Sequence, residues 1–202
     1  MGQAAGWSGV QKVLHWTMAA AIAVEVPVGF IMGWTYADKT PQGAAKHLLS
    51  SQIHHTLGLL LLAAVLWRLT LRMRNTAPPA PDGTSPAQAR LASGLQGLLY
   101  LGMLIVPLSG WAALSSLGSG GGYPAPPIWF FGHDGFGPGG MIPHIVPPVP
   151  WNAHTLFKYG FFGAIHRWAL IIGGCALALH IAGALMHQFV LRDGLIGRMW
   201  RG

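Results

Sequence analysis

Residues 162–190 form an apolar run that is long enough to cross a bilayer as one helix. The run carries His166, His180 and His187, at spacings of 14 and 7 residues. At about 100° per residue, these three side chains share one stripe of the helix, with Gly173 between the first two. Imidazoles in hydrocarbon are costly without partners, so the stripe predicts a bound cofactor or a conduction path, and Gly173 would let a bulky group approach the backbone.

The rest of the chain has the composition of an integral membrane protein. Only 8% of its 202 residues are charged, whereas a soluble domain normally has about a quarter. We therefore predict an all-α membrane protein, a single domain over residues 1–202 that forms a four-helix transmembrane bundle. The predicted spans are residues 10–35, 52–73, 91–116 and 162–190.

Three connections separate these spans. Residues 36–51 are expected to form a short polar loop and residues 75–90 a Pro-rich connector. Residues 117–160 form a long connection rich in Gly, Pro and aromatic residues. We expect it to fold onto the membrane interface through Trp129, Phe130, Phe131 and Trp151.

The basic residues predict the orientation of the bundle. They lie at the ends of the apolar runs, so the net charge of +7 indicates topology rather than a nucleic-acid partner. The side that holds the termini has more of them, which places both termini in the cytoplasm. On that side are Lys12, Arg72, Arg74, Arg90, Arg192, Arg198 and Arg201, and on the other are Lys39, Lys46, Lys158 and Arg167.

With this topology the histidines sort by depth into two pairs. His15 and His180 lie toward the cytoplasmic side, while His54 and His166 lie toward the outer side. The two levels are roughly 21 Å apart along a helix. Two histidines on opposing helices are what a six-coordinate haem iron needs for electron transfer, and two stacked haems would carry an electron across the membrane.

Several alternatives stay open at this point. His54 and His55 compete for the outer position, because adjacent helical residues differ by about 100° and only one can face the bundle core. An intramembrane histidine can also be an interhelical hydrogen-bond partner. A zinc or proton-transport site should have more acidic residues at the same level, and only Glu25 is available. Its role is either a proton relay or stabilisation of a kink beside Pro27.

The remaining polar residues are assigned by their position. Arg68, fourteen residues after His54, and Arg167, beside His166, are candidates for contacts with haem propionates, the alternative being that they extend to lipid headgroups. His187 is a candidate for a quinone or propionate contact, or is an ordinary interfacial histidine. Cys175 is expected to be buried in packing. We expect loop positions for His47, His133, His144 and His154.

Four motifs carry a resemblance to a known family. They are VLHW (13–16), QIHHTLGLLL (52–61) followed by Arg68, PLSGW (107–111) and HQFVLRDGLIGRMW (187–200). The chain resembles the prokaryotic cytochrome b561 family of four-helix di-haem membrane proteins over nearly its whole length. The resemblance implies two haems b, one between His15 and His180 and the other between His54 and His166. Glu25 and the long connection 117–160 depart from the pattern.

The resemblance also implies a location in the bacterial inner membrane and a function. The expected activity is transmembrane electron transfer with the quinone pool of a respiratory chain, with ubiquinone as the acceptor. One hypothesis adds superoxide oxidation at the outer face, where Lys39, Lys46, Lys158 and Arg167 would attract a small anion; alternatively they are interfacial anchors. Another hypothesis is a cytochrome b membrane-anchor subunit that passes electrons from a redox partner protein to quinone. No residue is assigned a catalytic role.

Overall fold

The computed structural model describes residues 7–81, 83–117, 142–150 and 152–200, and the regular structure in these ranges is helical. Four of the helices are long and apolar enough to cross a membrane. The predicted class, an all-α membrane protein with four spanning helices, is therefore confirmed for the part of the chain described. The elements are α1 (Gly9–Thr35), α2 (Pro41–Arg74), α3 (Pro86–Leu117), α4 (Tyr159–Met186), the π-helical turn η2 (His187–Leu191) and α5 (Gly197–Trp200).

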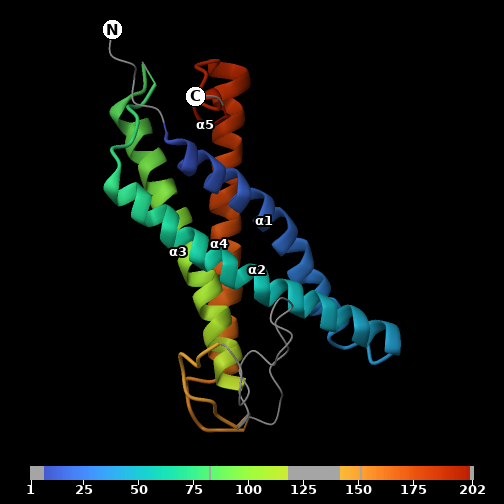
Figure 1. Cartoon of the computed structure of the whole chain (residues 1–202). Coiled ribbons are helices and arrows are strands. Elements are labelled where there is room, and N and C mark those ends of the chain that lie inside the picture. Colours follow the sequence, from blue (N-terminus) through green and yellow to red (C-terminus); the bar gives the residue numbers. More distant parts are fainter. Residues whose placement is uncertain (1–6, 82, 118–141, 151, 201–202) are drawn as a thin grey trace.

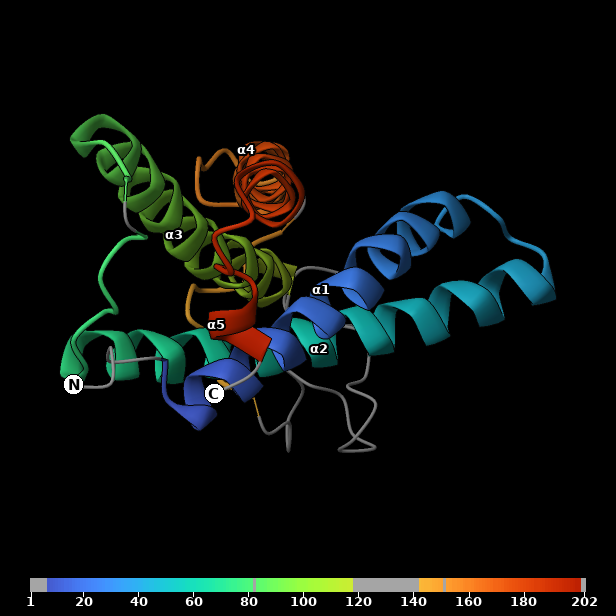
Figure 2. The same ribbon diagram turned by 90° about the horizontal axis from the view of Figure 1, so that it is seen from above.

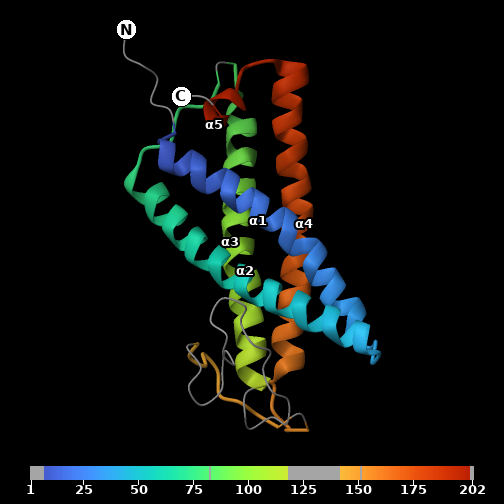
Figure 3. The ribbon, with the colours of Figure 1, turned by 45° about the vertical axis from the view of Figure 1, so that its right-hand side comes forward.

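The long helices pack as two pairs. α1 lies along α2 and α3 lies along α4, and α2 also contacts α3. The α1–α2 pair crosses the α3–α4 pair obliquely (Figures 1 and 3). The view from above shows α4 nearly end-on with α3 beside it, and α1 and α2 running together (Figure 2). The beginning of α1, the connector between α2 and α3, and α5 lie at one end, which we call the terminal end. The turn between α1 and α2 lies at the other, the hairpin end.

Capping residues, rather than hydropathy, decide where the helices begin. Thr40 accepts a hydrogen bond from a backbone N–H in the first turn of α2, and Pro41 follows as its first residue. The prediction of a loop over residues 36–51 is therefore wrong beyond Thr40. α3 likewise begins at Pro86, where Ser85 and Gln88 cap each other. Both helices begin before the apolar stretch. Outside the bilayer core, a helix can begin wherever its first backbone N–H groups find hydrogen-bond acceptors, as they do at these caps.

The tightly packed interior is small. Met18, Leu62 and Val65 form its buried cluster, with Tyr100 and Met103 of α3 packed against them. This cluster joins α1, α2 and α3 near the middle of the bundle. The C-terminal part of α3 is buried through small side chains that allow close approach of its neighbours, namely Ser109, Ala112, Ala113, Ser115 and Ser116.

Cys175 is exposed on α4, so the prediction of a buried packing role is wrong. In a membrane protein the helix face that meets lipid is as apolar as the face that meets protein. An apolar neighbourhood in the sequence therefore does not predict burial inside the protein.

The described part of the long connection folds back onto α3. The Trp111 indole N–H donates to the Pro143 carbonyl oxygen at 3.0 Å. The backbone N–H of Ile145 donates to the Ser115 hydroxyl oxygen at 3.3 Å. Residues 142–150 therefore cover the end of α3. Of the aromatic residues and histidines assigned to this connection, Trp129, Phe130, Phe131, His133 and Trp151 lie outside the described residues.

α3 and α4 approach each other at two glycines. A Cβ on Gly102 would stand 3.6 Å from the Cα of Gly173, an ordinary contact. We predict that Gly102→Ala is tolerated, whereas Gly102→Leu destabilises the bundle by about 1–3 kcal/mol because it pushes the two helices apart. Thermal unfolding of the two variants in detergent measures this. Equal melting temperatures for Gly102→Leu and Gly102→Ala would contradict the close approach.

Candidate functional site

The first histidine pair joins α1 to α4. The ring centroids of His15 and His180 lie 6.2 Å apart, and their planes are inclined by 81°. Both side chains are half-buried. The Trp16 indole lies beside this pair, with its ring centroid 5.2 Å from that of His15. The structure thus brings together the two residues that the depth argument paired at the terminal end.

The second pair joins α2 to α4. The ring centroids of His54 and His166 lie 6.0 Å apart, again with planes inclined by 81°. His55 contacts the His54 ring at 5.8 Å, but no ring contact joins His55 to His166 in the described parts of the chain. The structure therefore places His54, and not His55, opposite His166, a choice that helical spacing alone left open.

One helix supplies a member of each pair. His166 and His180 are separated by 14 residues of α4, or roughly 21 Å along the axis. Gly173 lies midway, and a Cβ there would meet no described atom within 4 Å. The opposing residues come from α1 at one level and from α2 at the other, because these helices cross α4 obliquely (Figure 3).

The His166 ring rests on the backbone of α3. Its Nδ1 lies 2.7 Å from the Val106 carbonyl oxygen. A carbonyl only accepts hydrogen bonds, so Nδ1 carries the proton and Nε2 keeps its lone pair free. Gly110 makes this approach possible, since a Cβ there would stand 3.3 Å from the ring. Neither Val106 nor Gly110 was assigned from the sequence, although Gly110 belongs to the PLSGW motif.

The His54 ring rests on α1 in a similar way. A Cβ on Gly29 would stand 3.1 Å from its Cε1 and 3.2 Å from its Nδ1. Glu25 lies one turn before Gly29, and its Oε1 is 2.9 Å from His54 Nδ1, an ion-pair contact without the alignment of a hydrogen bond. The Nδ1 edge of the ring is thus held against α1. The sequence indicated Glu25 as an unusual residue in a spanning helix, but its partner, His54, could not be inferred from the sequence.

The two pairs fit the axial ligands of haem iron. Metal–imidazole bonds of about 2.0 Å place two coordinating nitrogens about 4 Å apart, which agrees with ring centroids separated by 6.0 and 6.2 Å. Within the described ranges, no group of three or more His, Cys, Asp or Glu side chains is placed to hold a metal ion. A metal at either pair would therefore need a cofactor that supplies the other ligands, as a porphyrin does.

The two candidate arginines have different surroundings. The Arg68 guanidinium donates to the Gln11 carbonyl oxygen at 2.8 Å, and its positive charge acts on both His15 and His180. It therefore lies at the terminal-end pair, where a propionate would need it. Arg167 is exposed, and it makes no hydrogen bond or ion pair to the residues that the structure describes.

His187 lies in a compact turn at the end of α4. Its Nδ1 contacts the Asp193 carboxylate, and Asp193 also accepts a hydrogen bond from the Leu195 backbone N–H at 3.0 Å. Arg192 between them has a φ of 54°, and this left-handed residue reverses the chain. The sequence placed His187 on the histidine stripe of α4, but did not indicate that Asp193 is its partner.

The turn sends the C-terminal segment back over the terminal end. The Trp16 indole N–H donates to the Met199 carbonyl oxygen at 2.9 Å, and the Trp16 and Trp200 rings lie 5.1 Å apart. Arg198 donates to the Pro79 carbonyl oxygen at 3.0 Å, in the connector between α2 and α3. Since Trp16 is next to His15, this segment lies close to the His15–His180 pair.

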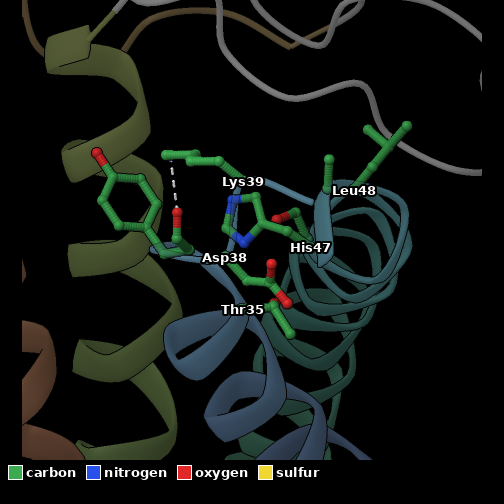
Figure 4. A pocket seen from close by; sticks show the side chains of 8 residues that line it. Thr35, Asp38, Lys39, His47 and Leu48 are labelled. Atoms are coloured by element: carbon green, nitrogen blue, oxygen red, sulfur yellow. Dashed lines mark hydrogen bonds between the residues drawn. The ribbon is translucent and has the colours of Figure 1, made fainter. Parts of the chain in front are cut away.

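A small pocket of about 180 Å³ lies at the hairpin end (Figure 4). His47, in α2 and not in a loop as expected, lines it, and its Nδ1 lies 3.0 Å from the Met32 carbonyl oxygen. Lys39 at its rim donates to the Tyr36 carbonyl oxygen at 2.9 Å. His144 and His154, which were also expected in loops, lie outside the helices and are exposed.

Comparisons with known proteins agree with this arrangement. The family model described as prokaryotic cytochrome b561 matches residues 6–202. Cytochrome b562 of Cereibacter sphaeroides is 30% identical over 201 residues, which cover 100% of this chain and 99% of that protein. Cytochrome b561 homolog 1 of Escherichia coli K12 is 26% identical, covering 96% of each chain. A Yersinia pestis protein named Probable superoxide oxidase CybB is 28% identical, covering 96% of this chain and 94% of that protein.

The contact between His187 and Asp193 generates a prediction about pH. Desolvation raises the pKa of Asp193, but hydrogen bonds from His187 and the Leu195 backbone outweigh it and leave the pKa below its ordinary value. The carboxylate therefore stabilises the turn at neutral pH, and this contribution is lost as the pH falls through and below about 4. Hydrogen exchange of residues 192–200 should accelerate over that range.

The variant Asp193→Asn should show the same effect at neutral pH, with exchange of this segment roughly fivefold faster, the factor for a lost contact of about 1 kcal/mol. Asp38→Asn, at the hairpin end, is the matched control and should leave the segment unchanged. Equal exchange in wild type and Asp193→Asn would show that the carboxylate does not hold the turn.

Proposed function

Because this chain belongs to the prokaryotic cytochrome b561 family, we propose that its two histidine pairs each hold one haem b and carry electrons between the two faces of the membrane. The observation that supports this most directly is the spacing of the rings, 6.2 Å for His15–His180 and 6.0 Å for His54–His166. Both pairs share α4, so one rigid helix sets the distance between the two levels.

The residues of the protein hold each haem, orient it and insulate it. A haem b bound at each pair supplies a one-electron iron couple. His15 with His180 and His54 with His166 would each hold one haem, and two imidazole ligands would leave no open position for a substrate, which would suit the site to electron transfer. The Val106 carbonyl fixes which nitrogen of His166 faces inward. Arg68, at the terminal-end pair, is placed to meet a propionate bidentately.

At the hairpin end, which we assign to the outer face, we propose that the electron donor is superoxide. One relative carries the name of a superoxide oxidase. Lys39 and Lys46 lie around the start of α2, and Lys158 and Arg167 lie around the start of α4, the two helices that carry His54 and His166. We propose that these four side chains form a positive rim. Such a rim raises the encounter rate of a small anion.

At the terminal end, which we assign to the cytoplasmic face, the acceptor is ubiquinone. Two superoxide ions each lose one electron and become O₂, and ubiquinone takes up the two electrons with two protons to become ubiquinol. His187 lies just beyond His180 on α4 and is oriented by Asp193. We assign its Nε2 a contact with the quinone, because an imidazole whose Nδ1 donates to Asp193 can accept a hydrogen bond at Nε2 from a quinol hydroxyl.

The ligand assignment predicts a distinct haem content for each histidine variant. His180→Ala should lose the haem at the terminal end and His54→Ala the haem at the hairpin end, so each purified variant should retain about half of the wild-type haem. His55→Ala is the matched control and should keep both, because His55 does not face His166. Haem per chain is measured by absorbance of the pyridine adduct. Two haems in His54→Ala would disprove the pairing.

The proposed donor predicts a dependence on salt. Replacing Lys39 and Lys46 together by Gln should slow reduction by superoxide about tenfold at low ionic strength and flatten its dependence on salt. Lys12→Gln, at the opposite end, is the control. A rate equal to wild type at all salt concentrations would remove the steering role. Failure of superoxide to reduce the wild type, with co-purification of a second polypeptide, would favour a membrane-anchor subunit instead.

A further inference from the structure

Glu25 is an acidic residue in the middle of a spanning helix, and the proposed electron path does not use it. Its side chain is 13% exposed. A carboxylate at this depth is costly unless it has a partner or a function. The position of Glu25 in α1 therefore has a physical reason.

The surroundings of Glu25 are shaped to bring it to His54. Its Oε1 lies 2.9 Å from His54 Nδ1. Gly58, one turn after His54 on α2, leaves room for the carboxylate, since a Cβ there would stand 3.7 Å from Oε1. Gly29 on α1 leaves room for the imidazole. Two glycines, one on each helix, thus allow the carboxylate and the ring to meet.

The same place holds buried polar atoms without a hydrogen-bond partner. Among the described residues these are Glu25 Oε2, His54 Nδ1 and His55 Nδ1, of which His54 Nδ1 keeps its ion-pair contact with Glu25 Oε1. Buried polar atoms are nearly always hydrogen-bonded in stable proteins. The hydrogen-bonding capacity of these side chains is thus not fully used at the level of this histidine pair.

The two rings of this pair therefore rest on different groups. His166 Nδ1 faces a neutral carbonyl, that of Val106, and His54 Nδ1 faces a carboxylate. A carboxylate behind an imidazole fixes its orientation and makes it a stronger donor to a metal on the other side. Negative charge nearby also favours the oxidised, more positive state of that metal.

The other pair has the opposite charge beside it. The Arg68 guanidinium donates to the Gln11 carbonyl oxygen at 2.8 Å, one turn before His15 on α1. A positive charge favours the reduced state of a metal held there. Resting on the proposed haem sites, we infer that Glu25 positions His54 and makes the His54–His166 site harder to reduce, while Arg68 makes the His15–His180 site easier to reduce. An electron entering at the hairpin end then moves energetically downhill toward the terminal end.

The experiment is a spectroelectrochemical titration of the purified, haem-loaded protein. Glu25→Gln removes the charge but keeps the shape of the side chain. We expect the midpoint potential of one haem to rise by the equivalent of about a tenfold change in its reduction equilibrium, 59 mV for one electron, with the other unchanged. In a His180→Ala background, which keeps only the haem at His54–His166, the remaining potential should show the same shift.

Two further variants complete the test. Arg68→Gln should lower the potential of the haem at His15–His180 and leave the other unchanged. Glu25→Asp retains the carboxylate and should restore the wild-type potential. If Glu25→Gln loses haem, the potential measured in Glu25→Asp tests the role of the carboxylate instead. Unchanged potentials, or an equal shift of both haems in Glu25→Gln, would overturn the inference even if electron transfer to quinone is intact. Absence of bound haem in the wild type would instead overturn the proposed function.

Discussion

The free-energy cost of placing imidazoles in hydrocarbon is the constraint on which this structure depends. His166 and His180 are fixed on one face of α4, and neither can be left without a partner. In the fold, α1 and α2 cross α4 obliquely, and the ring of His15 lies beside that of His180 and the ring of His54 beside that of His166.

Glycine plays a positional role in this arrangement. Gly29 and Gly110 stand where the rings of His54 and His166 lie against the neighbouring helices. In each case the Nδ1 edge is turned toward a helix, to the Val106 carbonyl oxygen for His166 and to Glu25 for His54. Small residues therefore allow a ring, as well as a helix, to approach closely.

The two ends of the bundle carry different chemistry. Lys39 lies in the turn between α1 and α2 and Lys46 lies early in α2, and the carboxylate of Glu25 contacts His54. At the other end, Arg68 donates to the backbone of α1 one turn before His15, and Trp16 donates to the backbone of the C-terminal segment. The two histidine pairs therefore differ in the charged groups beside them.

The sequence by itself determined the class, the four spans, and which histidines share a depth, because hydropathy and helical periodicity are local properties of the chain. It misplaced the start of α2 and the exposure of Cys175, since caps and lipid-facing surfaces are not visible in apolar content. Only the tertiary structure decided between His54 and His55, and gave Glu25 and His187 their partners. Glu25 and His54 lie on different helices, and their contact depends on the angle at which α1 and α2 cross. His187 and Asp193 meet because the backbone reverses at Arg192. No local sequence pattern encodes either the crossing angle or the reversal.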